Sequence, residues 1–292
     1  MIEGSIVAIV TPMLASGEID YQAFDRLIEW HIASNTDAIV VVGTTGESPT
    51  LSEQEHCALV RHCVEKVAKR VPVIAGTGSN STREAIFFTR AAREYGADAC
   101  LLVVPYYNKP SQEGLYQHFK IVSESIDIPQ ILYNVPSRTG ADLLPETVSR
   151  LADIPNIVGI KEASGNMDRC RELLSTCGDR ISIYGGDDAT AMELMLAGGR
   201  GNISVTANLL PQQMHDLCKL ALQSDAVGAA AINAPLALLH NKLFVEGNPV
   251  PVKWAMARLG LIQSGLRLPL VQLSPGFHGT LLDAMSKAGL AV

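Results

Sequence analysis

The stretch that decides the fold is Ile157–Ser164, which reads IVGIKEAS. Three of its first four residues are β-branched, and a turn with a proline precedes it, so it is typical of a short buried strand. Side chains of a strand alternate between its two faces, so Gly159, Lys161 and Ala163 share one face. Two of these three residues are small, which predicts room for a long amine beside them.

Lys161 is the one charged residue on that face, and it has two interpretations. An unperturbed lysine has a pKa near ~10.4, and burial lowers this value because it disfavours the charged form. A neutral amine can attack a ketone and form a Schiff base. Alternatively, Lys161 is a structural lysine paired with a carboxylate, although Glu162 points to the opposite face. The stretch alone leaves both interpretations open.

The composition bounds the class of protein. A chain of 292 residues suits one barrel with an appendage, and 47% apolar against 18% charged residues allows a large core. The net charge of -7 argues against nucleic acid and anionic membranes as partners, because both attract basic surfaces.

The sequence also argues against several kinds of site and location. No apolar run reaches the ~18 residues of a membrane span, and the first four residues do not resemble a signal peptide. The six cysteines form no Cys-x-x-Cys pair, so we expect reduced thiols in a cytoplasmic protein. No cluster of histidines and carboxylates has the spacing of metal ligands, and no metal or organic cofactor is expected.

Eight apolar, β-rich runs are the predicted strands. They are Ser5–Val10, Asp37–Gly43, Val71–Thr77, Ala97–Pro105, Pro129–Pro136, Ile157–Ser164, Ile181–Gly186 and Gly201–Ala207. Helical patterns separate them, the clearest of which begins with a capping box of Ser52 and Glu55, while the next runs from about Ser81 to Tyr95. Eight even strand–helix units without a dinucleotide fingerprint favour an α/β fold, a (β/α)8 TIM barrel, over an open doubly wound sheet.

The end of the chain is predicted to form a separate helical part. The barrel should occupy residues 1–223, and residues 224–292 should form a C-terminal helical subdomain that carries no chemistry of its own. Its expected helices are Ala226–Leu243, Pro251–Leu259 and Pro275–Ala288.

Active sites of such barrels lie where the strands end, so the residues that follow each strand are the candidates. After the second strand, Thr44 and Thr45 lie in a glycine-rich turn whose hydroxyl and N–H groups could hold a carboxylate, and Glu47 would organise that loop. Tyr106 and Tyr107 follow the fourth strand, and they could serve the mouth, a subunit contact or simple packing.

Two more candidates follow from the fifth strand. Tyr133 lies among apolar residues on one face, close to Lys161 if that face is the barrel interior. Arg138 follows that strand and could grip a carboxylate, although solvated loop arginines are common. After the seventh strand, the glycines of Gly185–Asp188 could cradle a phosphate, but the two aspartates would repel one and are expected to cap the next helix.

These motifs together resemble a known family. The segments GTTGE at 43–47, YNVP at 133–136 and GIKE at 159–162 are similar, in order and spacing, to those of the pyruvate-dependent aldolases of the dihydrodipicolinate synthase and N-acetylneuraminate lyase family. The resemblance covers the whole chain. Within the family, an arginine at position 138 resembles the pattern of the synthases and is not usual in the sugar-acid aldolases. A sugar-acid aldolase remains the alternative function. A non-catalytic barrel that binds a keto acid is a second alternative.

The resemblance implies a role for each candidate residue. Lys161 would form the Schiff base with pyruvate, Tyr133 would shuttle protons, and Thr44 would link it to Tyr107 of a neighbouring subunit. Pyruvate would be held by Thr45 and by main-chain atoms near Gly186 and Ile203, and Arg138 would bind the carboxylate of L-aspartate 4-semialdehyde. The implied product is 4-hydroxy-tetrahydrodipicolinate, on the diaminopimelate route to lysine.

The resemblance also implies an assembly and a regulatory site. Members are usually homotetramers built as pairs of tight dimers, and some are inhibited by lysine. The positions that match the regulatory pocket are Ser48, Pro49, Glu53, His56, Asn80, Glu84 and Tyr106. Glu53 departs from the histidine of some strongly regulated members, which puts lysine inhibition in doubt.

Overall fold

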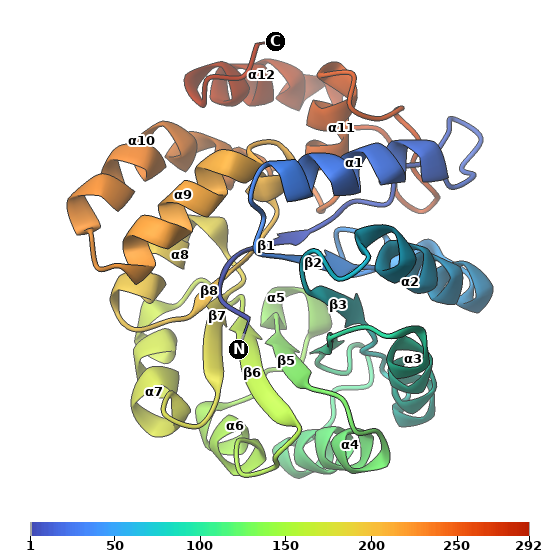
Figure 1. The fold of residues 1–292 in the computed structure, drawn as a ribbon, viewed down its shortest axis with the longest axis vertical. Coiled ribbons are helices and arrows are strands. Elements are labelled where there is room, and N and C mark those ends of the chain that lie inside the picture. Colours follow the sequence, from blue (N-terminus) through green and yellow to red (C-terminus); the bar gives the residue numbers. More distant parts are fainter. Residues whose placement is uncertain (1, 292) are drawn as a thin grey trace.

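The protein is a closed parallel barrel of eight strands surrounded by helices (Figure 1). The computed structural model describes residues 2–291. The strands pair in chain order and β8 closes against β1. They are β1 (Gly4–Ala8), β2 (Ala38–Val41), β3 (Val73–Gly76), β4 (Ala99–Val103), β5 (Gln130–Asn134), β6 (Ile157–Glu162), β7 (Ser182–Gly185) and β8 (Gly201–Ser204).

The predicted (β/α)8 barrel is therefore confirmed, and each strand is followed by at least one helix. The helices of the ring are α1 (Tyr21–Ala33), α2 (Glu53–Val67), α3 (Thr82–Tyr95), α4 (Gln112–Ser125), α5 (Pro136–Thr139), α6 (Pro145–Leu151), α7 (Met167–Cys177), α8 (Asp188–Leu196) and α9 (Pro211–Leu222). The capping box of α2 is present, with Ser52 and Glu55 each bonding the other's backbone N–H.

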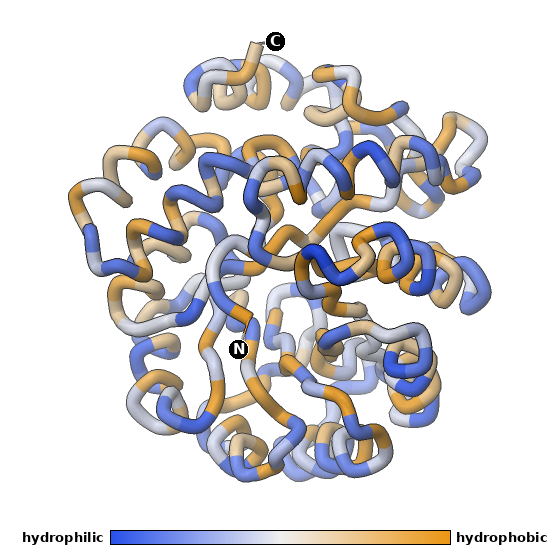
Figure 2. Tube along the Cα trace, in the orientation of Figure 1, coloured by the Kyte–Doolittle hydropathy of each residue, from blue (hydrophilic) through white to orange (hydrophobic). Residues whose placement is uncertain are grey.

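The core has two parts that the strand alternation separates. Side chains such as Ile131, Tyr133 and Tyr184 fill the barrel interior, whereas Leu132 and its equivalents face the surrounding helices. The outer helices mix hydrophilic and hydrophobic residues along their length (Figure 2), so that one face of each packs on the barrel. Among the described residues, no helix has the length and apolarity needed to cross a membrane.

The C-terminal helices form as predicted, with ends shifted by a few residues. They are α10 (Ala226–Lys242), α11 (Val250–Arg258) and α12 (His278–Lys287), and Pro275–Phe277 forms a short 3₁₀ turn before α12. Helix α10 packs on α8, α9 and α12, while α11 and α12 lie beyond α1 (Figure 1). Their buried residues belong to the same hydrophobic cluster as the outer barrel, so no gap marks the boundary expected at residue 223.

Candidate active site

A cavity of about 280 Å³ opens where the strands end, at the face where active sites of these barrels lie. Lys161 reaches into it from β6, and Tyr133 from β5. The two residues are paired in register across these strands, which places the Lys161 Nζ 4.4 Å from the centre of the Tyr133 ring. The predicted proximity of these two side chains is confirmed.

The barrel interior changes the acid–base behaviour of both residues. Burial lowers the pKa of Lys161 to about 8, helped by the positive charge of Arg138 and opposed by the negative charge of Asp188. Burial raises the pKa of the Tyr133 phenol, against the effects of Arg138 and of a hydrogen bond with Thr44. At neutral pH the site therefore holds a lysine with an appreciable neutral fraction beside a protonated phenol.

The room for the lysine side chain comes from a different glycine than expected. A Cβ on Gly159 would lie 2.8 Å from the Tyr184 ring, so the space at Gly159 belongs to this tyrosine. A Cβ on Gly186 would instead lie 2.9 Å from Cε of Lys161. The glycine that follows β7 thus makes room for the amine, and the prediction for Gly159 was wrong because it considered one strand in isolation.

Residues of the C-terminal part of the chain bond to the turn after β2. Asn248 donates a hydrogen bond of 2.9 Å from Nδ2 to the Thr45 hydroxyl oxygen. Because that oxygen already accepts this bond, the hydroxyl proton of Thr45 is free to be donated into the cavity. Glu47 is fully buried and forms an ion pair with Lys253 of α11, which agrees with its predicted role in the loop.

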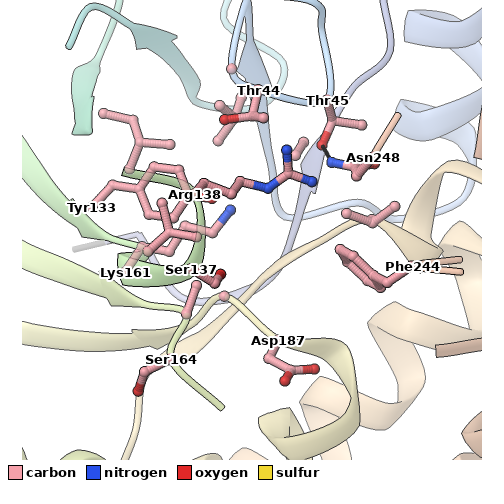
Figure 3. A pocket seen from close by; sticks show the side chains of 18 of the residues that line it. Thr44, Thr45, Tyr133, Ser137, Arg138, Lys161, Ser164, Asp187, Phe244 and Asn248 are labelled. Atoms are coloured by element: carbon pink, nitrogen blue, oxygen red, sulfur yellow. Dashed lines mark hydrogen bonds between the residues drawn. The ribbon is translucent and has the colours of Figure 1, made fainter. Parts of the chain in front are cut away.

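Arg138 lies at the entrance, on the short helix α5. It lines the cavity and is exposed, and no hydrogen bond or ion pair engages its guanidinium among residues 2–291. Figure 3 shows its guanidinium and the Lys161 amine both pointing into the cavity, with Asn248 joined to Thr45 at the far side. The site therefore presents a free cation suited to an anionic ligand.

The remaining predicted residues differ in whether they line the cavity. Gly186 and Thr44 line the cavity, but Ile203 does not, and its side chain lies in the barrel interior. Tyr107 is 89% exposed and lies outside the cavity of this chain, with its backbone in the left-handed region at a φ of 74°.

A second cavity adjoins the first. Its walls include six of the seven residues expected for lysine binding, and it shares Thr44, Val135 and Arg138 with the first cavity. The six are Ser48, Pro49, Glu53, His56, Glu84 and Tyr106. Asn80 does not line it, and its carbonyl accepts a hydrogen bond from Asn108.

Several cavity residues had no signal in the sequence. Phe244 and Asn248 come from the C-terminal part, so this part supplies a wall of the site although it was expected to carry no chemistry of its own. Asp187 caps α8 as predicted, whereas Asp188 is buried and accepts hydrogen bonds from the segment after β8. Within the described part of the chain, no group of three histidine, cysteine or carboxylate side chains could hold a metal ion.

Known proteins share this architecture over their whole length. Residues 1–288 match the model of the Dihydrodipicolinate synthetase family. The 4-hydroxy-tetrahydrodipicolinate synthase of Thioalkalivibrio sulfidiphilus is 57% identical over 292 residues, which cover 100% of this chain and 99% of that protein.

Solved structures agree with the sequence relatives. The chloride-inhibited dihydrodipicolinate synthase from Acinetobacter baumannii, in complex with pyruvate, has a TM-score of 0.98 at 53% identity and covers 100% of both chains. The enzyme from Cyanidioschyzon merolae with lysine bound has a TM-score of 0.95 at 38% identity and covers 99% of both. With a buried lysine at the mouth of a matching barrel and a relative more than half identical, the chain belongs to the dihydrodipicolinate synthetase family.

Proposed function

We propose that this chain condenses pyruvate with L-aspartate 4-semialdehyde through a Schiff base on Lys161. The product is 4-hydroxy-tetrahydrodipicolinate, on the diaminopimelate route to lysine. The observation that carries the proposal is the buried amine with its pKa lowered to about 8, beside Tyr133 and below an unpaired Arg138. The pyruvate complex of the Acinetobacter baumannii relative supports the first substrate.

The first half of the reaction uses the interior residues. The neutral amine of Lys161 attacks the keto carbon of pyruvate, an acid such as the Tyr133 phenol supplies one proton to the departing oxygen, and water leaves to give a protonated imine. This imine draws electrons when the pyruvate methyl group loses a proton, which yields an enamine. The Tyr133 phenol is placed to carry protons in these steps, and the free hydroxyl proton of Thr45 can be donated to the pyruvate carboxylate.

The second half brings the semialdehyde to the entrance. The enamine carbon attacks the aldehyde, and the amino group of the semialdehyde then displaces Lys161 from the imine carbon, which closes the ring and frees the enzyme. Arg138 would bind the carboxylate of the semialdehyde bidentately. A polyhydroxylated sugar aldehyde offers no carboxylate for Arg138, so a sugar-acid aldolase is the less favoured alternative.

Two measurements test this assignment. Pyruvate consumption is followed with L-aspartate 4-semialdehyde, N-acetylmannosamine and glyceraldehyde in parallel, and we expect turnover with the semialdehyde alone. Turnover only with a sugar aldehyde would overturn the substrate. Borohydride with pyruvate should label Lys161, and a full label on Lys161→Ala would overturn the nucleophile.

We also propose that the active protein is a homotetramer in which Tyr107 completes the Thr44–Tyr133 relay of a neighbouring subunit. Tyr107 and Tyr106 are 89% and 39% exposed, and a bulky residue at positive φ carries backbone strain that needs a structural reason. Slower turnover together with slower pyruvate labelling in Tyr107→Phe would support this relay. A fully active monomer would contradict it.

We further propose that lysine binds the second cavity and inhibits the enzyme. An effector there would contact Thr44 and Arg138, which also line the catalytic cavity, and the carboxylates of Glu53 and Glu84 could receive its ammonium group. A flat activity curve across millimolar lysine would remove this proposal. The cytoplasmic location remains a prediction, supported by six cysteines that are all free.

A further inference from the structure

A buried carboxylate stands at the start of α8 without a contact cation. Asp188 is 2% exposed, and it accepts hydrogen bonds from Asn202 Nδ2 at 2.6 Å and from the backbone N–H groups of Val205 and Thr206 at 3.0 and 2.9 Å. No ion pair engages it among residues 2–291. Burial opposes its ionisation, but the neighbouring His240 and these hydrogen bonds lower the pKa of the carboxyl, so the buried group is an anion.

The bonds of Asp188 join three elements that surround Lys161. Asp188 follows β7 two residues after Gly186, which packs against the Lys161 side chain. Its backbone partners fix the segment after β8, where Val205 lines the cavity. The Thr206 hydroxyl is in turn hydrogen bonded to Nδ1 of His240 at 2.8 Å, and His240 lines the cavity from α10.

The charges around the amine are few and can be named. Arg138 of α5 and Asp188 of α8 act on Lys161 with opposite signs. Asp187 lines the cavity but is half-buried, and Glu162 on the same strand is bonded to Asn134 and to the Ser164 N–H. Burial lowers the pKa of His240, against the attraction of Asp188. Tyr133 of β5 faces the amine as a phenol, and Cys218 of α9 is a buried thiol beside Asp188.

We propose that Asp188 is a positioning residue that fixes the segment after β8 and stabilises, through its buried negative charge, the cationic imine on Lys161. The inference rests on the function proposed above. When the amine attacks the keto carbon and water leaves, the imine nitrogen retains one proton and a positive charge. That charge stays in the barrel interior until the methyl proton departs, so a fixed anion nearby stabilises the intermediate at no cost in reorganisation.

The variant Asp188→Asn separates the charge from the geometry. The Oδ1 of Asn202 is buried and has no hydrogen-bond partner in the described residues. If the Asn202 amide flips, this oxygen can accept a bond from the amide introduced at position 188, whose own oxygen still accepts the two backbone N–H groups. The hydrogen bonds are kept and only the charge is lost. Asp187→Asn is the matched control, because it removes the same charge from the adjacent, half-buried residue.

The readout is the pH profile of borohydride-trapped pyruvate adduct, measured by mass spectrometry. Loss of the anion disfavours the lysine ammonium, so the Asp188→Asn midpoint should fall by about one pH unit. Above both midpoints, where the amine is neutral before it reacts, the pyruvate concentration that gives half-maximal adduct should rise by roughly tenfold, since one pH unit of lost stabilisation of the cationic imine is tenfold. Asp187→Asn should move the midpoint by less than about 0.3 unit, because water screens its charge.

The outcomes are distinguishable. An unchanged midpoint in folded Asp188→Asn, or an equal shift in Asp187→Asn, overturns the inference and leaves the proposed function standing. Absence of any adduct in the wild-type protein overturns the proposed function itself. If Asp188→Asn does not fold, the combination of Asp188→Asn with Asn202→Asp carries the test, because it keeps one carboxylate in the pair but displaces it. The retained charge should keep the midpoint near that of the wild type, and a midpoint lowered by about one pH unit in this folded variant would overturn the inference.

Discussion

Replacing Gly186 with alanine should displace the reactive amine. The added methyl group would lie 2.9 Å from Cε of Lys161 and 2.6 Å from Cβ of Ala163. Carbon atoms in contact are ~3.5–4.0 Å apart, so the Lys161 side chain must move by roughly 0.6–1 Å. The backbone of Gly186 is not in the left-handed region, so the effect comes from this contact and not from backbone strain.

The size of the effect follows from that displacement. A shift of ~1 Å in a reacting group can lower a rate by ~100-fold, so we expect imine formation to slow by roughly 10- to 100-fold in Gly186→Ala. Overpacking should also lower the free energy of unfolding by ~1–3 kcal/mol. The rate is measured by quenching the enzyme–pyruvate mixture with borohydride at fixed times, and the stability by denaturant unfolding.

Gly279→Ala is the matched control, because a Cβ there meets no atom within 4 Å. It should label at the wild-type rate. Labelling of Gly186→Ala at the wild-type rate would refute the packing of Lys161 against Gly186. An equal loss in both variants would show a general response to the substitution instead.

Three further expectations follow from the burial of particular groups. In the wild type, the rate of imine trapping should rise about tenfold per pH unit and level off above pH 8, since the pKa of Lys161 is lowered to about 8. A rate that continues to rise up to pH 10.5, the ordinary lysine pKa, would contradict the effect of burial. Lys253→Met should lower the free energy of unfolding by ~3–5 kcal/mol because it leaves Glu47 buried and unpaired, and adding Glu47→Gln should restore part of the loss. An equal loss in the single and double variants would exclude that explanation. Cys57, the one cysteine that is only half-buried, should be the first thiol to react with Ellman's reagent, and Cys57→Ser should abolish the fast phase.

Local patterns were enough to predict the barrel and its reactive lysine. The alternation of Ile157–Ser164 placed Lys161 on the interior face, and the neighbouring strand placed Tyr133 beside it. All eight predicted strands were longer than the observed ones. Apolar residues continue past the strand ends, and Val42, which was predicted within a strand, has a φ of 50° and begins the turn after β2.

Contacts between distant segments could not be predicted in this way. Asp188 and Asp187 are identical in type and adjacent, yet one is buried and the other caps a helix, because only Asp188 meets the N–H groups after β8. Asn248 and Lys253 carry no local sign that they bond to the turn after β2. The space at Gly159 was assigned to Lys161, but the side chain that occupies it is the Tyr184 ring. This ring belongs to β7, so the pattern of β6 alone does not reveal the contact.

The bonds from the C-terminal part to the turn after β2 have a consequence for the order of synthesis. Asn248 and Thr45 are 203 positions apart, and Lys253 and Glu47 are 206 apart. Closing so long a loop costs only ~2 kcal/mol more than closing one a tenth as long, so the finished molecule tolerates the separation well. A chain still on the ribosome has no such partners until residue 253 has emerged. The protein therefore gains its complete substrate pocket only after Asn248 and Lys253 have been synthesised and have emerged.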